Sequence, residues 1–176
     1  MLINIREAYS DKVLLRNLVL APKIKQAMAI KHIDDTLLQE VKMALKGCLA
    51  YDGIGIAANQ LGINKSFFLI RHDEETFKVY FNPKVVKASK IVITEKEACL
   101  SVPRYQLLVS RADEILARWD DIVEGSFVTV EQTLQERDAR IFLHEYDHLQ
   151  GMSIVDRSCE LNRVERRRIL QELSQR

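Results

Sequence analysis

The spacing of apolar residues predicts a helix in the first third of the chain. Between Asp34 and Ala50, apolar side chains recur every three or four positions and so share one face of an α-helix. Asp34 or Asp35 can cap the first turn. The apolar positions are Leu37, Leu38, Val41, Ala44, Leu45, Cys48 and Leu49. We therefore expect a helix over residues 34–50.

Residues 66–130 have a different pattern of residue types. Short runs rich in β-branched and aromatic residues alternate with charged or proline-bearing turns, which is typical of antiparallel strands. The runs are SFFLI, FKVYF, KIVIT, YQLLV, EILARW and SFVTV. They predict a mostly antiparallel sheet region.

A second helix is expected between Val130 and Gly151. The interval contains no other glycine and no proline, and Gly151 is a C-cap candidate. Its apolar stripe consists of Leu134, Ile141, Phe142 and Leu149. With the strands before it, this helix gives the element order of an α+β fold.

The tail, residues 160–176, predicts a third helix. Its apolar residues Leu161, Val164, Leu170 and Leu173 fall on one side, and its arginines are offset by nearby glutamates. The arginines are Arg163, Arg166, Arg167 and Arg168. The leading interpretation of these charges is a solvated helix face.

Composition limits the number of domains and the kinds of partner that we expect. The 176 residues are 47% apolar and 29% charged, with six glycines and three prolines, as expected of one globular domain spanning 1–176. The net charge of +1 gives no bias toward DNA or a membrane surface. The apolar run VLLRNLVLA is interrupted by Arg16, is too short to cross a bilayer, and is unlike an export signal. We expect a cytoplasmic protein.

The segment HEYDHLQG, residues 144–151, carries the first candidate chemistry. Positions i and i+4 share a helix face, so His144 and His148 can present two imidazoles to one metal ion. Glu145 lies one position further round, where it can act as general base for a metal-bound water. The alternative, a chance surface pair, is less favoured. The expected fold then has antiparallel sheets around a central helix that carries this HExxH pattern.

The third ligand decides which chemistry follows. Ile154 stands where a metzincin has its third histidine, which excludes that class. Glu165 and Glu172 lie among arginines in the tail and are poor candidates. Cys99 and Cys159 remain, and spacing alone does not choose between them.

A second unusual stretch, GIGIAANQLG at residues 53–62, follows the first helix. Its alternating glycines allow another backbone to come close, so that a bound peptide can pair there as an added strand. Gln60 can then support a developing oxyanion. Taken alone, the stretch is more typical of a helix end followed by a tight turn.

Three stretches in this order, GIGIAANQ, EACLS and HEYDHLQG, resemble the signature motifs of the peptide deformylase family, usually GxGxAAxQ, EGCLS and HExDHxxG. The resemblance implies a metal-dependent hydrolase that removes the formyl group from the initiator methionine of newly made polypeptides. Two departures stand out. Ala98 replaces the usual glycine, and residues 136–138 replace a glycine and apolar residues, a change that reshapes the pocket for the methionine side chain in a family member.

The resemblance also implies a role for each matched residue. The metal ligands are Cys99, His144 and His148; the acid and base is Glu145; the oxyanion donors are Gln60 and the backbone N–H of Leu100; the substrate-pairing backbones are those of Ile54, Gly55 and Ala98. The implied metal is iron(II) in the cell, with zinc, nickel or cobalt as alternatives. Cys159 is then a structural thiol.

The implied partner is an N-formylmethionyl nascent peptide. The resemblance also raises docking of the basic tail helix at the ribosome, as a hypothesis beside the solvated helix face. Two rival functions remain: a minimal HExxH metallopeptidase with another third ligand, and a non-catalytic deformylase-like protein whose closed metal site only holds the fold.

Overall fold

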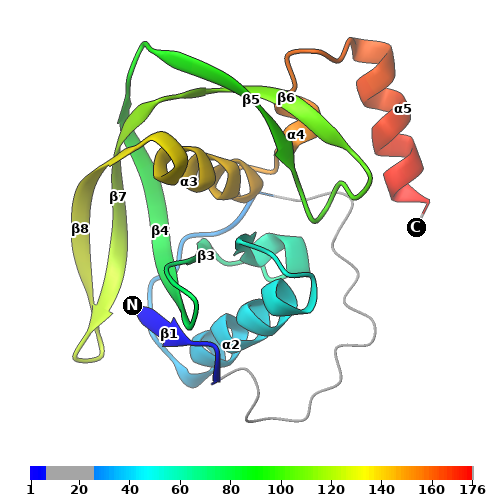
Figure 1. The fold of residues 1–176 in the computed structure, drawn as a ribbon. Helices are drawn as coiled ribbons and strands as arrows, with labels where there is room; N and C mark the ends of the chain where they lie inside the picture. The colour runs from blue at the N-terminus through cyan, green and yellow to red at the C-terminus, as the bar shows by residue number, and fades with distance from the viewer. Residues whose placement is uncertain (7–25, 176) are drawn as a thin grey trace.

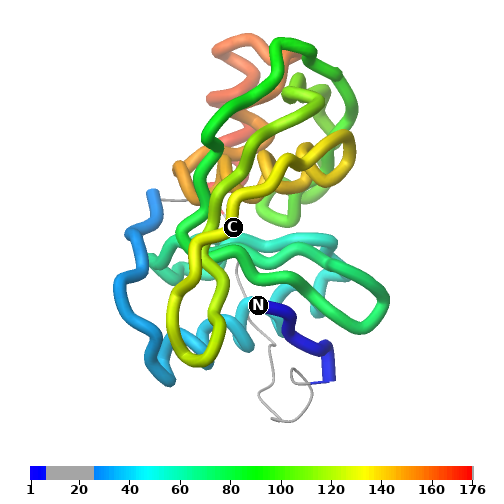
Figure 2. Tube along the Cα trace, turned by 90° about the vertical axis from the view of Figure 1, so that its left-hand side faces the viewer, coloured from blue at the N-terminus to red at the C-terminus, as the bar shows by residue number. Residues whose placement is uncertain are grey.

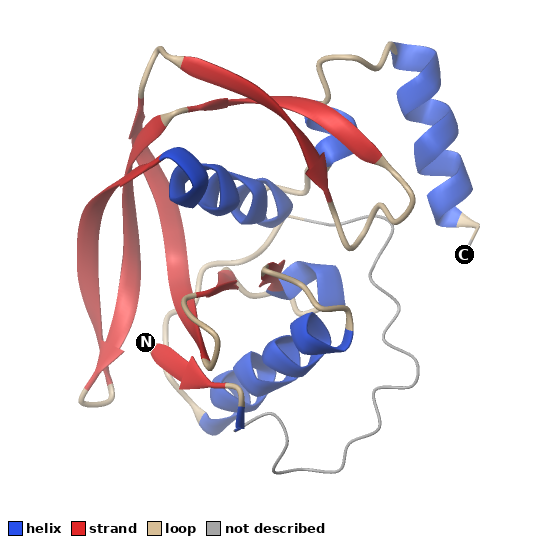
Figure 3. Cartoon of the chain, in the orientation of Figure 1, coloured by secondary structure: helices blue, strands red, loops and turns tan. Residues whose placement is uncertain are grey.

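The computed structural model describes residues 1–6 and 26–175, which form an α+β fold of helices around antiparallel strands (Figure 1; Figure 3). The helices are α2 (Asp35–Ala50), α3 (Glu136–Leu149), α4 (Ile154–Arg157), α5 (Arg163–Ser174) and the 3-10 helix η1 (Ala58–Leu61). The strands are β1 (Leu2–Asn4), β2 (Gly55–Ala57), β3 (Phe67–Arg71), β4 (Thr76–Ala88), β5 (Val92–Ala98), β6 (Gln106–Ala112), β7 (Glu114–Val123) and β8 (Ser126–Gln135). The apolar run around Arg16 lies outside the described residues. None of the described helices is long and apolar enough to cross a membrane.

The first predicted helix is confirmed as α2. The Asp34 carboxylate accepts a hydrogen bond from the backbone N–H of Leu37 at 2.7 Å, which satisfies one of the free donors of the first turn. Its apolar face is buried against β2, β3 and β4, where Ile56, Phe67 and Phe77 share one core cluster with it.

The predicted antiparallel strands form two sheets. The larger has the order β2-β3-β4-β7-β8, with β1 also paired to β4, and all pairings are antiparallel. Strands β5 and β6 form a separate hairpin. Register shifts between β4 and β7 bend the long strand β4, so that one end pairs with β3 and the other with β7 (Figure 2).

Helix α3 lies between the large sheet and the β5–β6 hairpin (Figure 1). Its apolar side is anchored by Phe142, whose ring packs edge-on against Phe68 at 5.0 Å and Tyr80 at 5.4 Å between centroids. Trp119 on β7 closes this cluster and is fully buried. Because these rings fix the rotation of α3, its opposite side faces the hairpin.

Three details differ from the sequence expectations. Strand β8 continues to Gln135, so the second helix begins only at Glu136. Residues 53–62 form β2 and η1 where a helix end and turn were favoured. In the tail, Ile169 and Leu173 are buried while Val164 is 77% exposed, so the predicted apolar side of α5 was partly wrong.

Candidate metal centre

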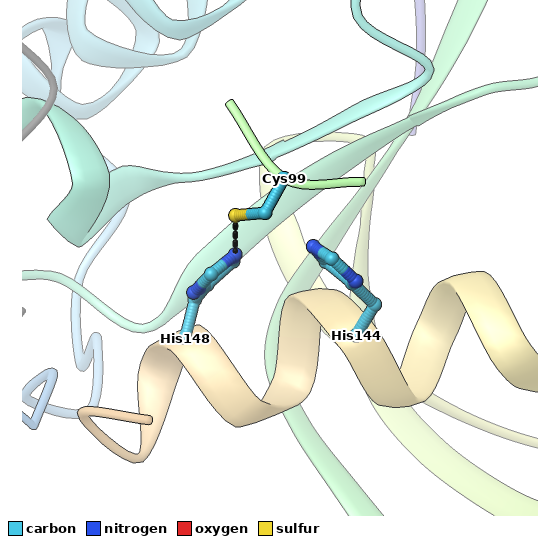
Figure 4. Close-up of side chains that lie close together, drawn as sticks. All are labelled: Cys99, His144 and His148. Atoms are coloured by element: carbon cyan, nitrogen blue, oxygen red, sulfur yellow. Dashed lines mark hydrogen bonds between the residues drawn. The ribbon is translucent and has the colours of Figure 1, made fainter. Parts of the chain in front are cut away.

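Two histidines of α3 meet one cysteine at the centre of the molecule. The possible ligand atoms of Cys99, His144 and His148 all lie within 4.8 Å of one another. Figure 4 shows both imidazoles rising from the same side of α3 toward the thiol, with His148 Nε2 at 3.2 Å from Cys99 Sγ. This is the grouping that the resemblance implied.

The hairpin brings Cys99 to this point. Cys99 directly follows β5 and packs with Val102, Val109 and Leu173 in a cluster that also includes α4. Cys159 is exposed instead, and its thiol donates to the Leu108 carbonyl at 3.3 Å. The fold therefore separates the two cysteines that spacing could not distinguish.

The two glutamates considered as third ligands are engaged elsewhere. Glu165 accepts a hydrogen bond from the Asn162 N–H as part of the α5 cap. Glu172 accepts one from the Tyr105 hydroxyl at 2.8 Å. His32 and His72 are exposed on the surface.

The outer nitrogen of each imidazole has an oxygen partner. His144 Nδ1 lies 2.9 Å from a Glu97 oxygen, and His148 Nδ1 lies 3.0 Å from the Met152 carbonyl. A proton held on Nδ1 by these acceptors leaves the Nε2 lone pair free as a ligand, which is the usual arrangement around metal-binding histidines.

Sequence reasoning missed the buried charge network beneath the histidines. Arg111 donates from two nitrogens to Glu97 at 2.6 and 2.9 Å, and from the third to Asp147 at 2.8 Å. Asp147 also accepts from Arg157, and Glu97 accepts from Arg140. Asp147 thus links α3 to β6 and α4. These ion pairs could not be predicted because the partners are far apart in the sequence.

This network sets the protonation of the cluster. Burial alone would raise the pKa of Glu97, but hydrogen bonds from His144 and Arg111 lower it to about 2. Burial alone would likewise raise the pKa of the Cys99 thiol, yet the two histidine rings hold it well below its usual value. The pKa of His144 rises to about 10 against the effect of burial, through its contacts with Cys99 and Glu97. Without a metal ion, the two shifts describe a Cys99 thiolate beside a protonated His144 ring, and a metal ion that binds there displaces the Nε2 proton.

Glu145 faces the same space without a partner. It is 4% exposed, and its Oε2 is buried without a hydrogen bond among the described residues. Burial raises the pKa of Glu145 above its ordinary value. A Cβ on Gly55 would lie 2.5 Å from Glu145 Oε1, so glycine is what lets β2 approach this carboxylate. A buried acceptor left unpaired calls for a proton donor.

Donors converge on the cavity from η1 and from the turn after β5. Gln60 Oε1 accepts from the Ala57 N–H at 2.8 Å, which fixes the amide so that its Nε2 reaches Ser101 at 3.0 Å. The N–H of Leu100, beside Cys99, has no hydrogen-bond partner in the described part of the chain. Asn59 donates to the His148 carbonyl and ties η1 to α3.

A cavity of about 1040 Å³ opens over the cluster between β2 and β5. Each of these is an edge strand of its sheet. Arg71 donates to the Ile54 carbonyl, so Gly55 and Ile70 form a non-hydrogen-bonded pair and the backbone groups of Gly55 point away from β3. Ala98 ends β5 and is not among the positive-φ residues, so its methyl group is accommodated without backbone strain. A volume of this size can hold a short peptide.

The donor set fits a divalent transition metal. One thiolate and two imidazoles suit zinc, iron(II), cobalt or nickel, and three protein ligands leave a position open for water or substrate. Glu145, whose Oε2 has no hydrogen bond within the described part of the chain, lines the same cavity as Cys99 and His144.

Comparisons with known proteins agree with this geometry. Residues 13–165 match the polypeptide deformylase family model. A peptide deformylase of Thermotoga neapolitana is 32% identical, over 85% of this chain and 89% of its own. The peptide deformylase of Synechococcus elongatus, solved with actinonin, is 31% identical with a TM-score of 0.72, covering 92% of this chain and 86% of its own. One from Acinetobacter baumannii, solved with Met-Ala-Ser, is 27% identical with a TM-score of 0.66, over 80% and 99%. The chain therefore belongs to the polypeptide deformylase family of enzymes.

Proposed function

We propose that this chain removes the N-formyl group from the initiator methionine of newly made polypeptides. The observation that carries the proposal is the unpaired, buried Glu145 oxygen beside the Cys99, His144 and His148 cluster, at the base of a peptide-sized cavity. The reaction is hydrolysis of an amide whose carbonyl carbon carries only hydrogen. It needs a base, a site for the developing oxyanion and a groove for the peptide.

In this proposal, Cys99, His144 and His148 hold one divalent ion, as membership of the family implies. Iron(II) is the proposed occupant in the cell, and zinc, nickel or cobalt fit the same donors. When bound, the ion acts as a Lewis acid and lowers the pKa of water toward neutrality. The contacts of Glu97 and Met152 with the outer ring nitrogens keep both imidazoles oriented.

Glu145 moves the proton. As water adds to the formyl carbon, Glu145 Oε2 accepts its proton; when the C–N bond breaks, the carboxyl returns the proton to the leaving nitrogen, giving formate and a free amine. A carboxyl whose pKa is raised by burial suits both halves of this exchange. The negative charge that develops on the formyl oxygen is stabilised by Gln60 Nε2 and the N–H of Leu100.

The peptide lies between the two open strand edges. Gly55 offers backbone groups that point away from β3, and Ala98 ends the facing strand β5. Ile54, whose carbonyl is already used by Arg71, contributes chiefly its side chain. Support comes from the Acinetobacter baumannii relative solved with Met-Ala-Ser, a peptide that begins with methionine.

Two further parts of the proposal concern the whole chain. Residues 1–176 act as one catalytic domain, because α3 contacts both the large sheet and the hairpin.

The basic helix α5 docks at the ribosome through Arg163 and Arg167, which have no ion pair among the described residues. Replacing both with glutamine then weakens ribosome binding and its salt dependence. Unchanged binding favours the solvated helix face. Deleting α5 is a poorer test, since Ile169 and Leu173 are buried.

The direct test is turnover of a formyl-Met tripeptide by protein prepared without oxygen and loaded with iron(II). We expect turnover by the native chain and a loss of about 100- to 10,000-fold in Glu145→Gln with metal content retained. Turnover that persists in Glu145→Gln contradicts the assigned base. Cleavage of internal bonds in unformylated peptides, without deformylation, would indicate a metallopeptidase instead.

A further inference from the structure

The side of α3 that carries His144 also carries two arginines into the cavity. Arg137, Arg140 and Ile141 precede His144 by seven, four and three residues, the spacing of one helix face. All four line the cavity above the cluster. The peptide groove thus has a cationic wall at the start of α3.

Only one of these arginines is neutralised. Arg140 donates to Glu95 at 3.0 Å, to Glu97 at 2.7 Å and to the Ile93 carbonyl. Arg137 is exposed and makes no hydrogen bond or ion pair with any described residue, although it lines the same cavity. Lys96 on β5 lines the cavity too and is likewise without a partner in the described ranges. Of the carboxylates that line the cavity, Glu95 and Glu97 pair with Arg140, Asp52 lies near Arg71, and Glu145 is buried at the metal cluster. Glu136 and Asp138 flank Arg137 in the first turn but do not line the cavity. Among the described residues, the unpaired charges that line the α3 end of the cavity are therefore those of Arg137 and Lys96.

The position of Arg137 is unfavourable for the helix itself. It lies in the first turn of α3, where the helix dipole disfavours a cation by about 0.3–1 kcal/mol. The preceding Glu136 has a φ of 49°, a left-handed conformation that costs a non-glycine residue energy as well. Helix stability therefore gives no reason for an arginine here, and the open cavity beside it does.

Distance defines what Arg137 can reach. Seven residues correspond to about 10 Å along the axis of a helix that rises 1.5 Å per residue. An extended peptide advances about 3.3 Å per residue, so a substrate whose formyl group lies at His144 brings its first three residues within this span. We propose that Arg137 is a specificity residue that selects formyl peptides with a carboxylate side chain among those three residues.

The chemistry is that of a guanidinium fork. Its planar set of donors matches a carboxylate with two parallel hydrogen bonds, which no amide side chain reproduces. Because Arg137 is exposed, salt weakens the attraction. The inference rests on the proposed deformylation, and adds to it the class of peptide that the enzyme prefers.

The test compares kcat/KM for formyl-Glu-Ala-Ala, formyl-Met-Glu-Ala and formyl-Met-Ala-Glu with the three peptides in which glutamine replaces glutamate. At low salt we expect a preference for glutamate of about three- to ten-fold at one of these positions. The preference should appear mainly in KM, since it reflects uniform binding, and should decline at high salt. In Arg137→Gln the ratio should fall close to one.

The matched control is Arg118→Gln. Arg118 is also an exposed arginine, so the substitution changes net charge equally, but it lies on β7 and does not line the cavity. It should leave the ratio as in the native chain. Ratios within two-fold of one at all three positions overturn the inference, as does a preference that survives Arg137→Gln. If no formyl peptide is turned over at all, the proposed function fails and this inference falls with it.

Discussion

The two ends of the cavity-lining face of α3 are built in opposite ways. At the His144 end, buried side chains hold one another: Glu97 joins His144 to Arg111, and Arg111 joins Glu97 to Asp147. At the other end, Arg137 is exposed and has no ion pair with any residue that the structure describes, and Glu136 before it has a backbone in the left-handed conformation. One helix thus carries a fixed end and an open end.

The buried end of this helix face serves the reaction, and the exposed end serves recognition of the peptide. Bond breaking requires groups held in place before substrate arrives, and a buried, mutually satisfied network provides that. Recognition of a peptide needs only a charge of the correct sign near its path. A departure from the family motif at residues 136–138 can therefore alter substrate choice while leaving the geometry at Cys99 intact.

The largest predicted effect comes from breaking the fixed end. Arg111→Met removes the link between Glu97 and Asp147, both of which are buried, and should lower the free energy of unfolding by about 3–5 kcal/mol. The control is Arg118→Met, which breaks an exposed pair with Glu131 and should cost about 1 kcal/mol or less. Urea denaturation measures both. Equal losses in the two variants would mean that burial of the network has no special role.

A smaller effect is expected from crowding the base. Gly55→Ala places a methyl group against the Glu145 carboxylate, which can turn aside because it ends a flexible side chain. We expect kcat to fall about 10- to 100-fold with little change in thermal stability. Gly47→Ala, whose methyl group meets the Leu61 side chain at 3.3 Å and the Ile56 side chain at 3.5 Å, should retain activity. Full activity in Gly55→Ala would show that the position of Glu145 matters less than proposed.

The smallest effect concerns the open end. Glu136→Gly relieves the left-handed backbone and should stabilise the protein by about 1 kcal/mol in thermal unfolding. Gln135→Gly, one residue earlier in extended geometry, should instead destabilise it by about 0.5–1 kcal/mol. If both substitutions changed the free energy of unfolding in the same direction, the backbone at Glu136 would not be strained.

The sequence predicted what depends on local pattern. The helix at 34–50 was clear because its apolar spacing and the Asp34 cap agree. The start of α3 was missed because no glycine or proline separates it from β8. The chain turns at Glu136, and glutamate is not a residue type that predicts a turn. The family resemblance led to Cys99, which spacing alone could not choose.

Contacts between distant segments were beyond prediction. Arg111 meets Glu97 and Asp147 only because the β5–β6 hairpin folds over α3, and no local pattern in one sequence encodes that pairing. The free charge of Arg137 was hidden for the same reason. Its neighbour Arg140 looks equivalent in sequence, and only the fold shows which of the two is neutralised.

The proposed metal site depends on Cys99 as its third ligand. The most direct measurement is cobalt(II) titration followed by sulfur-to-cobalt charge-transfer absorption in the native chain, Cys99→Ser and Cys159→Ser. Cys159 is the control because it is exposed and hydrogen-bonded to Leu108, outside the cluster. We expect one cobalt per chain with this absorption in the native protein and in Cys159→Ser, and its loss in Cys99→Ser. Absorption that persists without Cys99, or disappears without Cys159, would contradict it.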